Sequence, residues 1–174
     1  MPVLVAFPQF IVMLESMSTI LVVHHSPTPA TRGLADFLLD ATRDAADMAN
    51  EVLGSEQRID VVEVNALEPD IDQLRAADGL ILGTTANFGY ISGALKHYFD
   101  STFYAVQQDK RGLPMSWWIR GGYDTTGAAK AMRSITTGYE WQPCAEPVEF
   151  TGDIEPHHEE LKVMGQAVVG QVAS

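Results

Sequence analysis

The chain has 174 residues, 46% of them hydrophobic and 20% charged, and its net charge is −12. This length and composition predict one globular domain and exclude a disordered chain. The acidic balance argues against binding to nucleic acid or to an anionic membrane surface. Cys144 is the only cysteine, so no internal disulfide can form, and we expect a cytoplasmic protein.

Residues 1–16 differ from the rest of the chain. They are mostly apolar, contain Pro2 and Pro8, and lack Lys and Arg. The segment is too short to span a bilayer and has no positive region like that of a signal peptide. We therefore predict an N-terminal extension over residues 1–16, either preceding a native start at Met17 or forming an accessory arm, and one domain over residues 17–174.

From residue 20 onward, apolar strand patterns alternate with helical patterns. The predicted strands are residues 20–25, 60–64, 79–83, 115–121 and 148–151, and the predicted helices are residues 31–53, 71–75, 91–107, 125–136 and 156–172. The apolar face of the first helix is expected to hold Leu34, Phe37, Leu38, Ala45 and Met48. Apolar strands without alternation suit a parallel sheet covered on both faces. We predict an α/β fold with a doubly wound, five-stranded parallel sheet.

The loop after the first predicted strand, residues 26–33, has the composition of a phosphate site. Unpaired N–H groups and the dipole at a helix N-terminus favour an anion, and Ser26, Thr28 and Thr31 can add hydroxyl donors. Arg32 either assists the anion or stays solvated. The loop has neither a dinucleotide fingerprint nor the lysine of a P-loop, which favours a single terminal monophosphate. The alternative is an ordinary strand–helix turn with a capping residue.

Two further loops lie after predicted strands, at the edge where doubly wound sheets bind ligands. Residues 84–92 place Phe88 and Tyr90 around Gly89, and aromatic rings beside an approachable backbone suit a flat heterocycle. Residues 121–127 are rich in Gly and Thr, and Asp124 can cap the following helix. The alternative is that the two rings only anchor their loop and that Asp124 is only a cap.

The histidine pairs do not predict a metal site. His24 is followed directly by His25, and His157 by His158. Adjacent side chains on a strand point to opposite faces, so such a pair cannot chelate one ion. We expect no metal in this chain, and we interpret Cys144 as a small hydrophobic side chain.

Two segments resemble the flavodoxin-like superfamily. The flavodoxin signature is matched by Val22, Val23, Ser26, Thr31, Ala35 and Leu38, with His24 in place of its aromatic residue and Pro29 in place of a small one. Residues 83–100 are similar to the corresponding pattern of NAD(P)H-dependent FMN reductases and quinone reductases, with Thr85 in place of the usual proline. The resemblance covers the chain from about Ser18 to its end.

The resemblance implies FMN as cofactor and NAD(P)H as electron donor. The implied site residues are Ser26, Thr28, Ala30, Thr31 and Arg32 for the phosphate; Thr85, Ala86, Asn87, Phe88, Gly89 and Tyr90 for the ribityl chain and the ring edge; and Gly122, Tyr123, Asp124 and Gly127 for the other side of the ring. No catalytic side chain is implied, because the flavin carries the chemistry.

Three functional classes stay open at this stage. The first is an FMN-dependent oxidoreductase that takes hydride from NAD(P)H and reduces a quinone or another small acceptor. The second is a flavodoxin-type electron carrier with a protein partner, which acidity suits. The third is an interaction module of the same fold that has lost its cofactor. The expected partners are a small-molecule acceptor and a second copy of the chain, without nucleic acid or a membrane span.

Overall fold

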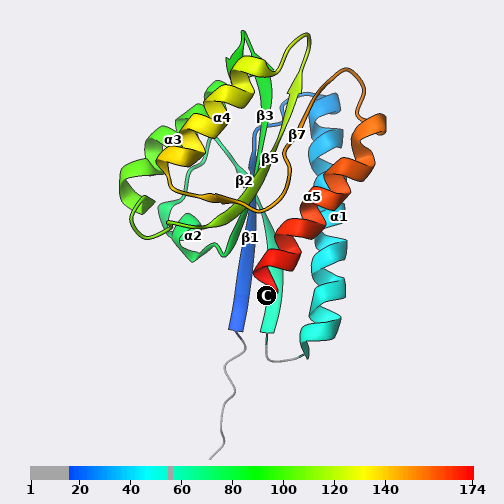
Figure 1. Ribbon diagram of the computed structural model, residues 1–174, viewed down its shortest axis with the longest axis vertical. Helices are drawn as coiled ribbons and strands as arrows, with labels where there is room; N and C mark the ends of the chain where they lie inside the picture. The colour runs from blue at the N-terminus through cyan, green and yellow to red at the C-terminus, as the bar shows by residue number, and fades with distance from the viewer. Residues whose placement is uncertain (1–15, 55–56) are drawn as a thin grey trace, which may run out of the picture.

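A computed structural model describes residues 16–54 and 57–174 (Figure 1). Residues 1–15 of the predicted extension lie outside these residues, and the first strand begins at Ser16. In chain order the elements are β1 (Ser16–His24), α1 (Pro29–Leu53), β2 (Gln57–Asn65), α2 (Ile71–Ala76), β3 (Gly79–Asn87), β4 (Tyr90–Ile91), α3 (Gly93–Val106), β5 (Pro114–Gly121), α4 (Thr126–Gly138), β6 (Gln142–Pro143), β7 (Val148–Thr151), a 3₁₀ turn (Glu155–His157) and α5 (His158–Val172).

The predicted α/β fold is confirmed. The sheet has the order β2-β1-β3-β5-β6, and all of these neighbours are parallel. The chain moves outward from β1 to β2, then crosses back to β3 on the other side of β1. The strand order therefore reverses at β1 and β3, and their carboxyl ends border the place where open α/β sheets bind ligands.

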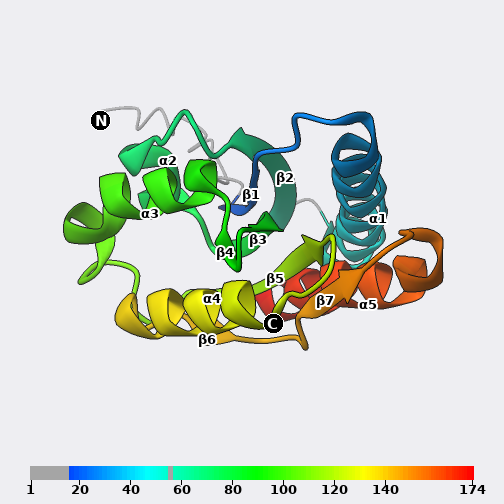
Figure 2. The same ribbon diagram turned by 90° about the horizontal axis from the view of Figure 1, so that it is seen from above.

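The two faces of the sheet are covered by different helices. One apolar cluster packs α3 and α4 against alternate residues of the central strands, including Leu21, Val23 and Leu82. The other packs α1 and α5 against the residues between them, including Val22 and Ile81. Figure 2 shows α3 and α4 on one side of the sheet and α1 and α5 on the other. Because both faces are buried, the central strands have no polar alternation.

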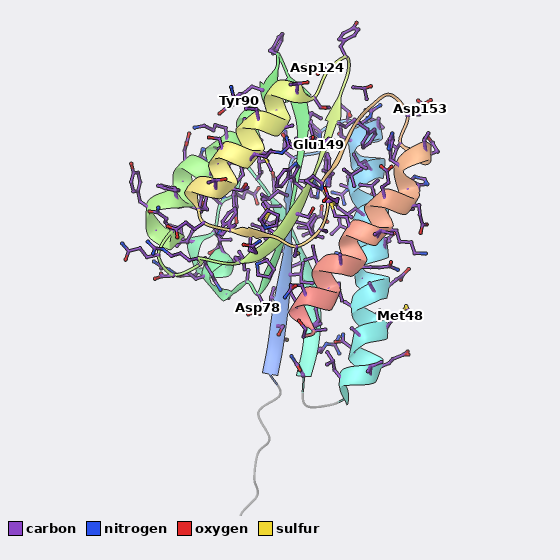
Figure 3. The ribbon with its side chains drawn as sticks, viewed as in Figure 1. Met48, Asp78, Tyr90, Asp124, Glu149 and Asp153 are labelled. Carbon is purple, nitrogen blue, oxygen red and sulfur yellow. The ribbon has the colours of Figure 1, made fainter. Side chains whose placement is uncertain are left out.

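The apolar face predicted for α1 is wrong at Met48. The buried residues of this helix recur every three or four positions, as Thr31, Leu34, Leu38, Thr42 and Ala46 do within a longer set. Met48 follows Ala46 by two residues, which places it on the opposite side of a helix with 3.6 residues per turn. Its side chain is 67% exposed and points away from the sheet (Figure 3).

Two short strands were not predicted. β4 pairs antiparallel with the end of β3, which runs four residues beyond its predicted end. β6 and β7 both pair with β5, at Pro114–Met115 and at Trp118–Gly121 respectively, so they share the fifth position of the sheet with a break at residues 144–147. In residues 16–54 and 57–174, no helix combines the length and apolarity needed to cross a membrane.

Candidate functional site

A cavity of about 440 Å³ lies at the carboxyl edge of the sheet. Its lining residues are His25, Pro27, Thr28, Thr31, Leu67, Thr85, Asn87, Ser92, Gly93 and Ala94. They come from the loop after β1, the end of β3 and the first turn of α3, with Leu67 added from the loop after β2. The N-termini of α1 and α3 both border the cavity. Two helix dipoles therefore favour negative charge there.

The predicted phosphate loop is partly occupied by its own hydrogen bonds. Thr28 Oγ1 accepts from the Thr31 N–H at 3.2 Å, and Thr31 Oγ1 accepts from the Thr28 N–H at 3.1 Å. The Thr31 hydroxyl donates to the Thr28 carbonyl at 3.0 Å, so it is committed to the cap of α1. Pro27 and Pro29 have no N–H. Because the Thr31 proton goes to that carbonyl, the Thr28 hydroxyl donates to Thr31 Oγ1 at 2.9 Å. The donors that this loop still offers to an anion are the Ser26 hydroxyl and the Ala30 N–H in the first turn of α1.

Arg32 is turned toward carboxylates and is not among the cavity-lining residues. Its guanidinium donates to Asp36 on the same helix and to Glu63 on β2. These hydrogen bonds lower the pKa of both carboxyl groups and raise that of Arg32. Sequence reasoning had no signal for this pairing, because Glu63 lies 31 residues away in the chain.

His24 lies directly behind the phosphate loop, and sequence reasoning gave it no role. The side chain is 3% exposed, and its Nδ1 lies 2.9 Å from Ser26 Oγ. Its Nε2 lies 3.3 Å from a Glu63 oxygen but makes no well-directed hydrogen bond there. Burial is the main cause that lowers the pKa of this imidazole. The sequence signal for this role is the histidine at a position where the flavodoxin signature has an aromatic residue.

The loop after β3 is a two-residue hairpin. Asn87 pairs with Tyr90, and the two residues between them, Phe88 and Gly89, have φ values of 51° and 76°. Two consecutive positive φ values are typical of a type I′ turn, which matches the twist of the paired strands. Thr85 and Asn87 line the cavity, whereas Ala86 pairs with Ile91. The Phe88 ring is fully exposed and the Tyr90 ring is partly exposed.

A β-carbon on Gly89 would meet no atom of residues 16–54 and 57–174 within 4 Å, so the left-handed backbone is what requires glycine there.

The loop after β5 stands beside this hairpin without lining the cavity. Asp124 Oδ1 accepts from the N–H and the hydroxyl of Thr126, at 3.0 and 2.7 Å. Asp124 thus contacts the first residue of α4 as predicted, but the N-cap is Thr125, whose side chain makes no capping hydrogen bond. The two hydrogen bonds from Thr126 lower the pKa of Asp124. Tyr123 is fully exposed, Gly122 has open space around it, and Gly127 packs against the Gly89 carbonyl. Figure 3 shows Tyr90 and Asp124 at the same end of the molecule.

Of the predicted site residues, Thr28, Thr31, Thr85 and Asn87 line the cavity, and the others lie beside or outside it. Sequence reasoning missed Ser92, Gly93 and Ala94, although Ser92 is a typical N-cap and accepts from the Leu95 N–H at 3.2 Å. Leu67, in the loop after β2, also lines the cavity and was not predicted. Among the described residues, no group of three or more His, Cys, Asp and Glu side chains is placed to hold a metal ion.

No protein-family profile matches the sequence, and neither does any curated protein. Solved structures do match. A flavodoxin from the domain Archaea has 13% identity and a TM-score of 0.71, and the match covers 90% of this chain and 99% of the flavodoxin. Two-electron reduced flavodoxin of Megasphaera elsdenii has 16% identity and a TM-score of 0.68, over 87% of this chain and 98% of that one.

An oxidoreductase from Corynebacterium diphtheriae has 18% identity and a TM-score of 0.63, over 91% of this chain and 96% of that one. At these identities the likeness concerns the backbone alone. The comparisons show that this chain has the flavodoxin fold.

Proposed function

We propose that this chain binds FMN at the carboxyl edge of its sheet and transfers electrons from NAD(P)H to a quinone or another small acceptor. The observation that carries the proposal is the cavity between the N-termini of α1 and α3, at the strand-order reversal between β1 and β3. The structurally similar flavodoxins and the similar oxidoreductase support it. The single cysteine suits a reducing compartment, so we place the activity in the cytoplasm.

The residues of this edge fit FMN. A phosphate needs hydrogen-bond donors and a favourable field, and the α1 N-terminus provides both through the Ser26 hydroxyl and the Ala30 N–H. The volume of about 440 Å³ is in the range of cofactor pockets. Thr85 and Asn87 line the same cavity and can hydrogen-bond a polyhydroxyl chain. Nothing in the loop prepares a second phosphate site, which favours FMN over FAD.

The chain's own residues would hold and orient the cofactor. The α1 N-terminus would fix the phosphate, and Thr85 and Asn87 would align the chain that links it to the ring. Phe88, Tyr90 and Tyr123 provide aromatic surface beside the cavity, two of them fully exposed. FMN would supply the hydride and single-electron chemistry, so no general acid or base is required of the protein.

A second candidate is an electron carrier with a protein partner. The net charge of −12 favours it, because electron carriers dock through complementary charge in weak, fast encounters. The two similar flavodoxins are also matched over 98–99% of their own length. A second subunit that covers the open edge near Tyr123 is compatible with either candidate, and we propose a homo-oligomer on that basis.

The binding experiment is a titration of the apo-protein with FMN, riboflavin and FAD, followed by flavin fluorescence. FMN should bind at least tenfold more tightly than riboflavin, since a hydrogen bond to a charged group contributes about 1.5–3 kcal/mol. Ser26→Ala should weaken FMN binding and leave riboflavin unchanged. Ser101→Ala, at an exposed position of α3, is the matched control. Equal affinity for FMN and riboflavin would contradict the phosphate site, and no flavin binding would favour the cofactor-less module.

Turnover separates the two electron-transfer candidates. The FMN-loaded protein is mixed with NADH or NADPH, with and without a small quinone, and nicotinamide absorbance is recorded. The proposed reductase should oxidise NADH or NADPH and reduce the quinone in ping-pong order, because donor and acceptor would use one open ring face in turn. No turnover with either nicotinamide, together with reduction by a ferredoxin-type reductase, would instead establish the carrier.

A further inference from the structure

A buried histidine and one glycine-dependent contact lie directly behind the phosphate loop. His24, Gly83 and Trp118 occupy one row across β1, β3 and β5. A β-carbon on Gly83 would lie 2.2 Å from the Trp118 ring, so the indole uses the space above this glycine. The imidazole of His24 lies 6.4 Å from that indole, centroid to centroid. Its position in the core is therefore defined by packing on one side.

The polar contacts of His24 connect the loop to β2. Nδ1 lies 2.9 Å from Ser26 Oγ, and Nε2 lies 3.3 Å from Glu63 Oε1. When Nδ1 carries the proton it donates to Ser26 Oγ, which frees the Ser26 proton for a ligand in the loop. Nε2 then has a lone pair beside a carboxylate and no hydrogen-bond partner. Only a proton on Nε2 turns this contact into a favourable one.

The charges around His24 also favour a proton on Nε2. The groups that interact with it are Glu63 from β2 and Arg32 and Asp36 from α1. With a neutral imidazole these residues sum to one negative charge, and with an imidazolium they sum to zero. Arg32 is already engaged by the two carboxylates, and residues 26–31 contain no Lys or Arg. A phosphate dianion in the loop therefore meets a net repulsion that a proton on His24 removes.

We propose that His24 is a positioning residue that takes up one proton from solvent when a phosphomonoester binds in the loop formed by residues 26–31. This inference rests on the proposed function. In the bound state Nε2 donates to Glu63, Nδ1 donates to Ser26 Oγ, and the Ser26 hydroxyl donates to a phosphate oxygen. The proton added to Nε2 is the only atom gained besides the ligand.

Burial supports the unprotonated state of the free protein, since it lowers the pKa of His24. A bound dianion acts in the opposite direction and raises the pKa. The two states therefore differ in proton content near neutral pH. The affinity for FMN should fall as the pH rises through the bound-state pKa, by up to about tenfold for each pH unit within the window.

The test is calorimetry of FMN binding at about pH 7 in two buffers of different ionisation enthalpy, with FMN affinity measured from about pH 5 to pH 8. We expect uptake of a fraction of a proton up to one, and none with riboflavin. The phosphate of FMN itself titrates near pH 6. The proton uptake due to His24 is therefore obtained as the difference in uptake between wild type and two variants. His24→Phe keeps a ring beside Trp118 and removes both nitrogens, and Glu63→Gln removes the acceptor of the added proton.

A measurement on the wild-type chain keeps the test independent of how the variants fold. The NMR titration of the His24 ring should give a higher pKa with FMN bound than without it. If FMN binds but proton uptake and the His24 titration do not change, the proposed function stands and this inference is wrong. If no FMN binds, both are wrong. Loss of uptake in both variants, with FMN still bound, is the expected result.

Discussion

A β-carbon placed on Gly127 would lie 2.0 Å from the carbonyl oxygen of Gly89. The first turn of α4 therefore packs directly on the hairpin between β3 and β4. Two of the three predicted cofactor loops can approach this closely only because residue 127 has no side chain.

Gly127→Ala should separate these two loops. The added methyl group cannot fit beside a backbone carbonyl, so we expect a loss of about 1–3 kcal/mol in unfolding free energy and weaker FMN binding. Chemical denaturation and flavin titration measure both. Gly170→Ala in α5 is the control, because its β-carbon would meet no atom of the described part of the chain and the change should not lower stability. An unchanged Gly127→Ala protein would show that the contact relaxes without cost.

We expect that Phe88 lowers the stability of the fold and contributes a contact to the ligand. A bulky residue with φ of 51° is strained, and asparagine tolerates this conformation better. Phe88→Asn should therefore raise the unfolding free energy by up to about 1 kcal/mol and weaken FMN binding. Phe88→Leu removes the ring but keeps the strain, so it should weaken binding without the gain in stability. If both variants bind FMN normally, the ring serves another purpose.

Gly83→Ala tests the packing behind the phosphate loop. The new methyl group would overlap the Trp118 indole, and we expect a loss of about 1–3 kcal/mol or more in unfolding free energy. The change should also displace His24 and alter tryptophan fluorescence. Gly33→Ala in α1, where the space is open, should stabilise the protein by about 0.5–1 kcal/mol.

The stability of the ligand-free protein should depend on His24 in mildly acidic solution. Because the pKa of His24 is lowered on folding, the unfolded chain binds a proton that the folded chain does not. Stability should therefore fall as the pH decreases through the unfolded value of about 6.5, by about 1.4 kcal/mol for each unit of pKa difference. His24→Phe should flatten the pH dependence of the unfolding free energy between about pH 5 and pH 7, whereas Ser101→Ala, at an exposed position, should not. An equal slope in both variants would contradict this account.

Much of the fold could be predicted from the sequence because it depends on local patterns. Apolar runs bounded by polar loops defined the five strand positions and the helices between them. The hairpin at Phe88 and Gly89 was not predicted, because its first turn residue is not one of the Asn, Asp or Gly residues that normally indicate a type I′ turn. The division of the fifth strand position between β6 and β7 was not predicted, because β6 has two residues, too few to form a sequence pattern.

The candidate site was harder to predict, because its contacts join distant parts of the chain. The loops at the carboxyl edge followed from fold class, and Thr28, Thr31, Thr85 and Asn87 do line one cavity. The direction of Arg32 depends on Glu63, and the role of the loop depends on which N–H groups the cap has already used. Neither is encoded in the spacing of residues along the chain.

The break between β6 and β7 has a consequence for self-association. Open sheet edges invite pairing with strands of other molecules, and proteins protect such edges with prolines, irregularities and short strands. This edge has Pro143 at the end of β6 and Pro147 as the last residue of the interruption, and neither strand exceeds four residues. An incoming strand cannot form a continuous ladder there. The feature that divides the fifth strand position also protects the chain from edge-to-edge aggregation at that side of the sheet.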